Sequence, residues 1–425
     1  RVLRAQVAQR TEQSSGLFRR ASHCLSTEHP APLRPDDKTK GFPMTVFDEL
    51  HNPVACEWHI GQLLRAMNQL RDGRPSPMVV RDTSNIRWLT AFDGVFDDED
   101  AHALYVAPDR VVLHTDSRYA KACEQAARRT PIRVDDTRES HASFVARQWN
   151  GSWLHGMPGA ELQIEDTITL AEYRALQKAF PADFPIGETD GVVRRLRSVK
   201  ERYEVARMRG AQAITDAAFS HIVEFMRPGM TEREVQLELD EFMLRHGAEG
   251  LAFASIVATG ANGANPHAVA GATMLEAGQC VVLDFGAKSY GYCSDMTRMV
   301  FLGEPESQMR SAWEAVRAAN EAVEAMLAPG VTGKEAHERA EAILAEGGFA
   351  GAMGHGLGHG VGLDIHEEPV LSPRNPEPLV EGNVVTVEPG IYLPGKFGMR
   401  LEDFGVVTDD GFEVFTKSTH EMVVI

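Results

Sequence analysis

Five residues in the last third of the chain carry side chains that bind metal ions. They are Asp284, Asp295, His359, Glu388 and Glu402. Four carboxylates and one imidazole form an oxygen-rich set of the kind that holds two divalent cations about 3.5–4 Å apart, an arrangement used to hydrolyse amide or phosphate bonds. The residue types therefore predict a dinuclear metallohydrolase.

The two aspartates lie in β-rich runs separated by a turn signal. Asp284 follows the apolar residues 281–283, Asp295 precedes the run 296–301, and Gly291 between them can supply a turn. The two strands can then fold back, so that both acids point to one side and share a cation. Either aspartate alone would be an ordinary strand end or cap, but an acid inside an apolar strand is costly to bury without a partner.

The two glutamates occur in a similar setting. Glu388 ends the strand-like run 383–387, and Glu402 follows the alternating residues 398–401. Fourteen residues separate the glutamates, which leaves room for a hairpin with Pro394 and Gly395 at its tip. The alternative, a solubility charge on an edge strand, is weakened because two such acids recur in apolar strands.

Three histidines lie among five glycines in residues 353–369: His355, His359 and His366. This pattern is not a helix face, and the glycines allow the backbone to approach a cluster of ligands closely. A solvated loop is the alternative. The metal-site interpretation is favoured because the acids need an imidazole to complete a hydrolytic site.

Periodicity and punctuation predict two domains. From residue 44 to about 190, short apolar runs alternate with helical stretches, which favours a small α/β domain. From about residue 194 to 425, a long amphipathic helix is followed by a capping box at Thr231 and Glu234, and further helices are expected near 308–326 and 333–346. The strands between these helix pairs carry the acids.

Residues outside these patterns have simpler interpretations. Residues 1–43 are rich in Arg, Gln, Ser and Pro, lack apolar periodicity and contain no apolar stretch of signal-peptide length, so we expect a disordered extension that need not belong to the native protein. The isolated histidines His114, His141 and His155 in the first domain are expected to be surface or turn residues.

Composition narrows the class of protein further. The chain of 425 residues is 43% hydrophobic and has a formal net charge of −18, which opposes nucleic-acid binding. No window reaches the roughly 18 apolar residues of a membrane helix. Its five cysteines lack a CxxC pair and indicate reduced thiols in the cytoplasm. Cys293 lies two residues before Asp295, but the carboxylates already fill the site.

Several motifs together resemble a known family. They are Asp-Phe-Gly at 284–286, Ser-Asp-Met-Thr-Arg at 294–298, the histidine and glycine motif at 355–367, Thr-Val-Glu-Pro-Gly-Ile-Tyr at 386–392 and Arg-Leu-Glu-Asp at 400–403. In this order they resemble the pita-bread metallopeptidases, which include aminopeptidase P and prolidase. The resemblance covers about residues 46–425. It implies an α/β (α+β) architecture: a small creatinase-type N-terminal α/β domain at 44–190, followed by a pita-bread catalytic domain at 194–425.

The resemblance implies a role for each candidate ligand. Asp295 and Glu402 would bridge both metals, Asp284 would chelate one, and His359 with Glu388 would hold the other. The metals would lower the pKa of a bridging water toward neutrality. Oxygen-rich ligands suit manganese, although zinc, cobalt or iron(II) would also fit.

Other residues match substrate-side positions of the family. His366 would stabilise the oxyanion, and His267 and His355 would contact the substrate or the departing nitrogen. Glu388 would carry a proton from water to the leaving imide. Tyr392 and Arg400 also match the substrate side. Methionine aminopeptidases share the five ligands but usually lack the N-terminal domain and this Tyr–Arg pair.

The resemblance implies cleavage before proline, in peptides with proline at the second position, and a homodimer. A dipeptidase must neutralise the carboxylate directly after proline, and prolidases often place Arg after the His-Glu-x-Pro motif. Here Val370 occupies that position, and Arg374, four residues on, is the alternative partner for the carboxylate. We therefore expect an Xaa-Pro aminopeptidase, with an Xaa-Pro dipeptidase as the alternative.

Three remoter interpretations stay open to test. Creatinase has the same fold without metal, but it has no use for a complete ligand set. A non-peptidase enzyme such as a dimethylsulfoniopropionate lyase is not excluded by the resemblance. A binding protein that kept the fold would normally lose ligands, and none of the five is missing here.

Overall fold

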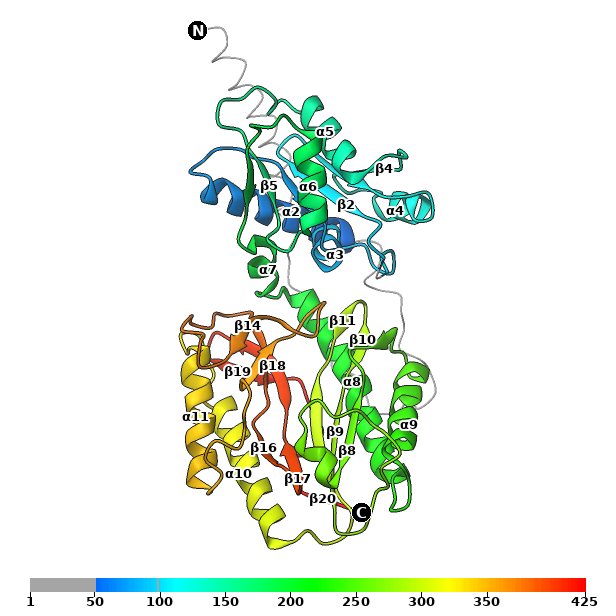
Figure 1. Ribbon diagram of the computed structural model, residues 1–425, viewed down its shortest axis with the longest axis vertical. Helices are drawn as coiled ribbons and strands as arrows, with labels where there is room; N and C mark the ends of the chain where they lie inside the picture. The colour runs from blue at the N-terminus through cyan, green and yellow to red at the C-terminus, as the bar shows by residue number, and fades with distance from the viewer. Residues whose placement is uncertain (1–50, 98) are drawn as a thin grey trace, which may run out of the picture. The chain divides into compact units, whose positions relative to one another are not determined.

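The computed structural model describes residues 51–97 and 99–425 (Figure 1). The expected extension at 1–43 and Cys24 lie outside the described residues, as do the first residues of the expected α/β domain. Among the described helices, none combines the length and apolarity that a membrane span requires.

The first part of the described chain builds a six-stranded mixed sheet in the order β4-β3-β2-β1-β5-β6. Its strands are β1 Met78–Val80, β2 Ala103–Ala107, β3 Arg110–His114, β4 Ile132–Asp135, β5 Leu162–Ile164 and β6 Ile186–Glu188. Its helices are α2 His51–Leu70, α3 Thr83–Thr90, α4 Ala120–Ala126, α5 His141–Gly151 and α6 Leu170–Ala179. Alternate residues of β2 enter different core clusters: Leu104 packs with α2 and α3, and Tyr105 packs with α5. The sheet is therefore buried on both faces, as the alternation of short apolar runs and helices predicts.

One histidine of this sheet differs from the expectation. His114 is only 3% exposed, and its Nδ1 lies 2.8 Å from Nδ1 of His141 while its Nε2 lies 2.9 Å from the Thr137 carbonyl oxygen. It is buried because it ends a central strand and stacks on Phe144. His155 is exposed, as expected.

The second part places strands between two pairs of helices (Figure 1). After the short α7 Val192–Arg197 come α8 Arg202–Phe225 and α9 Glu232–Arg245, and later α10 Ser307–Glu324 and α11 Gly333–Glu346. The capping box at Thr231 and Glu234 is confirmed: the Thr231 hydroxyl accepts from the Glu234 N–H, and the Glu234 carboxylate accepts from the Thr231 N–H. The two expected later helices are also present within two residues of their expected ends.

Four sheets fill the space between these helices. One has the order β20-β12-β9-β8 and another β14-β13-β15-β18-β19, with smaller sheets β11-β10-β7 and β16-β17. The strands are β7 Gly250–Leu251, β8 Ile256–Thr259, β9 Cys280–Phe285, β10 Ala287–Ser289, β11 Tyr292–Cys293, β12 Met296–Phe301, β13 Gly358–Gly360, β14 Glu367–Leu371, β15 Val384–Val387, β16 Gly390–Leu393, β17 Phe397–Arg400, β18 Asp403–Thr408, β19 Gly411–Val414 and β20 Val423–Val424.

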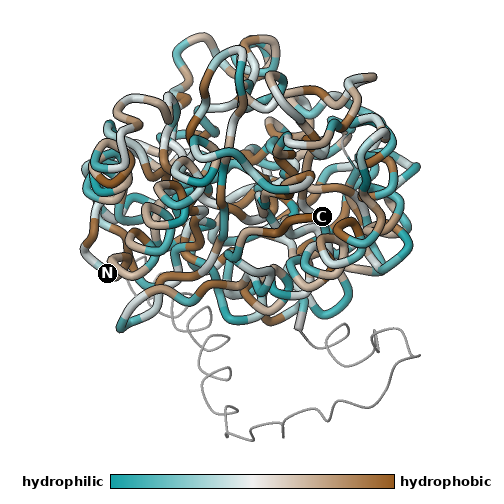
Figure 2. Tube along the Cα trace, turned by 90° about the horizontal axis from the view of Figure 1, so that it is seen from below, coloured by the Kyte–Doolittle hydropathy of each residue, from teal (hydrophilic) through white to brown (hydrophobic). Residues whose placement is uncertain are grey.

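Strand β9 of the sheet β20-β12-β9-β8 packs against apolar side chains on both faces. Val281 and Leu283 pack in the cluster that includes α8 and α9, and Val282 packs in the cluster that includes α10 and α11. Figure 2 accordingly shows hydrophobic stretches of chain in the interior and hydrophilic stretches in many outer turns. A polar side chain in these strands therefore needs a specific partner.

Candidate metal centre and active site

Strand pairing brings the two candidate aspartates into one region. Strands β9 and β12 are antiparallel, with Asp284 opposite Thr297, as the predicted fold-back requires. The reversal contains a second small hairpin, β10–β11, whose turn residues Tyr290 and Gly291 both have positive φ. Asp295 lies between β11 and β12, beside the end of β9.

The hairpin expected between the two glutamates is present. It consists of β16 and β17, with Pro394 and Gly395 at its tip, and the glutamates flank it. Glu388 follows β15 and Glu402 precedes β18, and these two strands pair directly, with Val387 opposite Asp403. The hairpin is thus an excursion from a longer strand pair that holds the two acids side by side.

Three candidate ligands form one cluster. Single ligand atoms of Asp295, His359 and Glu402 all lie within 4.8 Å of one another. Glu388 adjoins them, with its Oε1 3.4 Å from Nε2 of His359, which is also 3.6 Å from Oδ2 of Asp295. Asp284 is linked to this cluster by its strand partner Thr297. The Thr297 hydroxyl donates a 2.6 Å hydrogen bond to Oε2 of Glu402.

The orientation of His359 suits a ligand. Its Nδ1 lies 3.0 Å from the Gly360 carbonyl oxygen, so this nitrogen carries the proton and donates it. The Nε2 lone pair then faces Asp295 and Glu388. Burial lowers the pKa of His359, which favours the neutral imidazole that binds metal.

The acids are short of compensating positive charge. Asp284, Asp295 and Glu402 are 7%, 3% and 2% exposed. Burial raises the pKa of Asp284 and Glu388, and it raises those of Asp295 and Glu402 well above the ordinary range, where neighbouring carboxylates add to the effect. Oδ1 of Asp284 is buried without a hydrogen-bond partner. A divalent cation would satisfy both the charge and this oxygen, so the residues present fit a metal site.

A chain of hydrogen bonds links Asp284 to a histidine. Arg400 pairs with Asp284, donates from Nε to the Thr297 hydroxyl at 2.9 Å and donates from Nη1 to the Tyr392 hydroxyl at 2.7 Å. That hydroxyl lies 3.1 Å from Nε2 of His355, whose Nδ1 lies 2.6 Å from the Gly356 carbonyl oxygen. Burial raises the pKa of Tyr392 to about 12, so the phenol keeps its proton to donate to His355.

The two remaining predicted histidines face solvent. His366 is exposed, and its ring packs edge-on against that of His359 at a centroid distance of 4.4 Å. His267 is exposed as well and follows the short 3-10 helix Gly260–Ala264. It lies near enough to lower the pKa of both His355 and His366, although burial is the larger cause for each. Imidazoles therefore line the solvent side of a buried acid cluster.

Sequence reasoning missed two threonines. Thr297 accepts from Arg400 and donates to Glu402. Thr386 accepts from the His359 N–H at 3.0 Å and donates to Oε1 of Glu388 at 3.1 Å. Each threonine lies two residues from an acid in the same strand run, which places it on the same face, and this spacing was the signal available.

Cys293 does not belong to the cluster. Its thiol is buried in the hydrophobic core and lies 3.7 Å from the Leu363 carbonyl oxygen, and burial raises its pKa to about 12. Proximity in sequence to Asp295 therefore does not bring the sulfur into the site, because Cys293 ends β11 and the chain leaves that strand before it reaches Asp295.

Comparisons with known proteins assign the chain to a protein family. The model of metallopeptidase family M24 matches residues 206–409, which include all five candidate ligands, and the creatinase/prolidase N-terminal domain model matches residues 62–199. The chain is 34% identical to the uncharacterized peptidase YqhT of Bacillus subtilis over 348 residues, which are 82% of this chain and 95% of that protein. The chain belongs to metallopeptidase family M24.

Solved structures of similar proteins support this family assignment. An Xaa-Pro dipeptidase from Bacillus anthracis superposes with a TM-score of 0.80 at 35% identity, covering 87% of this chain and all of that one. An X-Pro aminopeptidase from Thermotoga maritima gives a TM-score of 0.74 at 32% identity, covering 85% and 100%. The predicted architecture, a creatinase-type α/β domain followed by a pita-bread domain, is confirmed. As an M24 metallopeptidase, the protein is a hydrolase of a family that uses divalent metal ions.

Proposed function

We propose that this M24 enzyme is an Xaa-Pro dipeptidase that works with two divalent metal ions. The observation that carries the proposal is the convergence of Asp284, Asp295, His359, Glu388 and Glu402 in a chain of which 87% superposes on a named Xaa-Pro dipeptidase. A curated Xaa-Pro dipeptidase from Lactobacillus delbrueckii subsp. lactis adds support at 36% identity over 260 residues, which are 61% of this chain and 70% of that protein.

In this proposal Asp284, Asp295 and Glu402 would hold one ion, and His359 and Glu388 would hold the other together with Asp295 and Glu402. Ligand atoms of Asp295, His359 and Glu402 lie within 4.8 Å of one another, which supports the second of these ligand sets. When bound, the ions supply Lewis acidity and lower the pKa of a nearby water toward neutrality. Manganese suits the four oxygen ligands best, with zinc, cobalt and iron(II) as the alternatives.

The remaining residues act on the substrate and its protons. Glu388 is only partly buried, unlike the other three acids, so it is the carboxylate best placed to pass a proton from water to the leaving imide nitrogen. The exposed His366 donates to the developing oxyanion, and His267 and His355 contact the substrate. Arg400 is 4% exposed and committed to three partners, so it orients Asp284 and Tyr392, and Tyr392 reaches the substrate through His355.

An Xaa-Pro aminopeptidase is the second candidate, and it is the one that the sequence led us to expect. Val370 favours it, because this exposed residue cannot pair with the carboxylate of a dipeptide. The relatives named as Xaa-Pro dipeptidases shift our preference to the dipeptidase. The exposed Arg374, four residues after Val370, is then the nearest guanidinium in sequence that could meet the carboxylate.

Two peptides distinguish the candidates. The manganese-loaded protein should release proline from Ala-Pro and leave Ala-Pro-Ala largely intact, and Ala-Ala should be a poor substrate. Efficient cleavage of Ala-Pro-Ala would instead establish the aminopeptidase. Equal rates with Ala-Ala would contradict specificity for proline. The same assay with zinc, cobalt and iron(II) identifies the most active metal, and a Glu388→Gln variant controls for contaminating peptidases.

We also propose a cytoplasmic homodimer. The family resemblance supports the dimer, and four free buried cysteines, Cys56, Cys123, Cys280 and Cys293, are consistent with a reducing compartment. Light scattering during size-exclusion chromatography tests the dimer directly. A mass equal to one chain would contradict it.

A further inference from the structure

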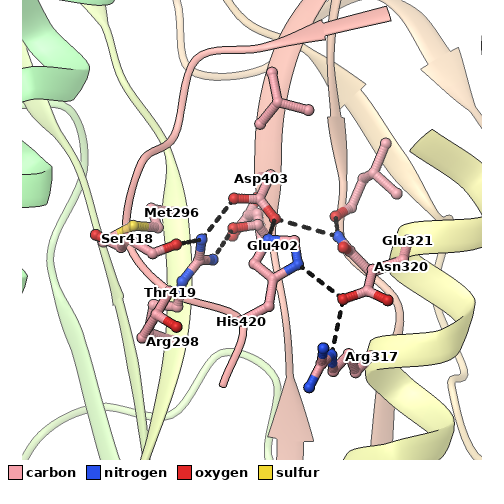
Figure 3. A network of polar contacts seen from close by, with 12 residues as sticks. Met296, Arg298, Arg317, Asn320, Glu321, Glu402, Asp403, Ser418, Thr419 and His420 are labelled. Carbon is pink, nitrogen blue, oxygen red and sulfur yellow. Dashed lines mark hydrogen bonds and ion pairs between the residues drawn. The ribbon is translucent and has the colours of Figure 1, made fainter. Parts of the chain in front are cut away.

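A second buried polar network adjoins the acid cluster at Glu402 (Figure 3). Its centre is Asp403, which follows Glu402 in sequence and is 0% exposed. The Asp403 carboxylate accepts from Nη2 of Arg298 at 2.6 Å, lies 2.8 Å from Nε2 of His420, and lies 3.5 Å from Nδ2 of Asn320. Three elements distant in sequence, β12, α10 and the C-terminal segment, therefore meet at one side chain.

This network holds the backbone at both candidate glutamates. Nη1 of Arg298 donates to the main-chain oxygen of Glu402 at 2.7 Å. Nδ2 of Asn320 donates to the main-chain oxygen of Val387, the residue before Glu388, at 2.9 Å. Because Val387 and Asp403 are strand partners, the same two groups fix β15 and β18 at the point where their acids leave the sheet.

The C-terminal segment anchors the network from outside. Ser418 accepts from Nη2 of Arg298 at 2.9 Å through its main-chain oxygen, and its N–H and hydroxyl donate to Asp216 of α8 at 2.8 and 2.6 Å. Nδ1 of His420 lies 3.4 Å from Oε1 of Glu321 in α10. His420 therefore faces a carboxylate at each ring nitrogen.

We propose that Arg298, Asn320, Asp403 and His420 form a positioning network that sets the affinity of the metal centre by fixing Glu388 and Glu402, an inference that rests on the proposed metal sites. Buried ion pairs such as Arg298–Asp403 contribute little net stability compared with apolar residues of similar volume, so stability alone does not account for them. Residues that orient metal ligands typically change metal affinity or activity by about 10–100-fold when they are replaced.

The same cluster could be interpreted as a further metal site. Ligand atoms of Glu324, Asp403 and His420 lie within 4.8 Å of one another. However, the guanidinium of Arg298 already occupies one oxygen of Asp403, and a cation at this place would face that positive charge. The contacts therefore favour a positioning role, and metal binding here becomes an outcome of the test.

Calorimetric titration of metal-free full-length protein with Mn²⁺ tests the proposal. In His420→Gln, the amide can still donate to Asp403 but carries no charge and loses the contact with Glu321. We expect the affinity for Mn²⁺ to fall about 10-fold or more with unchanged stoichiometry, and excess Mn²⁺ to restore hydrolysis. Asn320→Ala, which releases the Val387 carbonyl group, should weaken Mn²⁺ binding in the same way.

The control is His337→Gln, because His337 is also buried, at 9% exposure, but lies in α11 away from the network. It should bind Mn²⁺ as the wild type does. A lower melting temperature with wild-type Mn²⁺ affinity in both test variants would reduce the network to a structural role and overturn the proposal. Loss of one metal equivalent with unchanged affinity for the rest would also overturn it, in favour of a site at Glu324. Because the readout is Mn²⁺ binding, failure of the proposed Xaa-Pro activity would be seen separately.

Discussion

At the scale of single residues, the candidate centre is a set of buried acids that lack enough positive charge. Asp295 shows this most clearly, since it is 3% exposed and lies in the cluster with His359 and Glu402.

Asp295→Asn should lower metal content by at least one equivalent and reduce peptide hydrolysis by about 100-fold or more, because an amide is a poor bridging ligand. Chelation should inactivate the wild type reversibly, whereas added metal should not rescue the variant. Elemental analysis with activity assays measures both effects, and Asp240→Asn outside the site is the matched control. Full activity in either the chelated enzyme or Asp295→Asn would refute the metal centre.

Tyr392 offers a second test at this scale. Tyr392→Phe removes the acceptor of Nη1 of Arg400 and the donor to His355. An unsatisfied buried donor costs about 1–3 kcal/mol, so thermal unfolding should occur at a lower temperature. Since the five candidate ligands are untouched, the metal content should stay at the wild-type level while kcat falls. A variant that loses metal in parallel would show that Arg400 supports the ligands mainly through Tyr392.

The residue types and spacings predicted most of this site, and the exceptions have a physical reason. Acids in apolar strands are costly to bury, so Asp284, Glu388 and Glu402 were conspicuous in the sequence. Thr297 and Thr386 were not, because threonine is ordinary in strands and its hydroxyl gains a role only when the pairing register is known. Arg298 reaches Asp403 across 105 residues of sequence and His420 reaches Glu321 across 99, which no local pattern reveals.

At the scale of elements, local signals located helices better than strand partners. The capping box at Thr231 predicted the start of α9, and the ranges expected for the two later helices match α10 and α11 closely. The pairing of β15 with β18 was missed, because the adjacent turn signal at Pro394 and Gly395 belongs to the intervening β16–β17 hairpin. Turn signals identify the nearest reversal of the chain, whereas pairing depends on contacts that form only in the fold.

Helix α8 carries a pH-sensitive carboxyl group near its start. Burial raises the pKa of Glu204 to about 7 from 4.5, even though its carboxylate accepts from the Glu201 N–H and from the Tyr292 hydroxyl. The folded state thus binds a proton more tightly than the unfolded state. Its contribution to stability is complete below about pH 4.5 and is lost as the pH rises through about 7.

Glu204→Gln should remove this dependence, because Gln stays neutral and the Tyr292 hydroxyl can accept from its amide. Relative to the wild type, the variant should gain up to about 3 kcal/mol between pH 4.5 and pH 8. Thermal unfolding of the metal-free protein at several pH values measures the difference, with the exposed Glu57→Gln as the control. Parallel pH profiles for wild type and Glu204→Gln would contradict the assignment.

At the scale of the whole molecule, the two regions matched by the family models share one core. A single hydrophobic cluster includes Ile86 and Leu104 from the first region and Val361 and Phe404 from the second. A polar link accompanies it: Asn85 of α3 accepts from Nη1 of Arg197 at 2.7 Å, and Arg197 and Lys200 both pair with Glu367. The sequence predicted two domains but could not show this continuity, because each partner lies more than 100 residues from the other.

Arg197→Met tests how strongly the two regions depend on each other. The change leaves Glu367 with Lys200 as its remaining cation and Asn85 Oδ1 without its guanidinium donor, and breaking a buried pair in this way costs about 3–5 kcal/mol. Glu367 follows His366 directly, so kcat/KM should fall while Mn²⁺ affinity stays unchanged. Differential scanning calorimetry should show one transition at a lower temperature, because the shared core still unfolds as a unit.

Arg195→Met on the same helix is the matched control, since its pair with the exposed Asp190 at 3.6 Å is worth less than about 1 kcal/mol. Two separate transitions in Arg197→Met would show that the buried pair, and not the shared apolar core, joins the two regions.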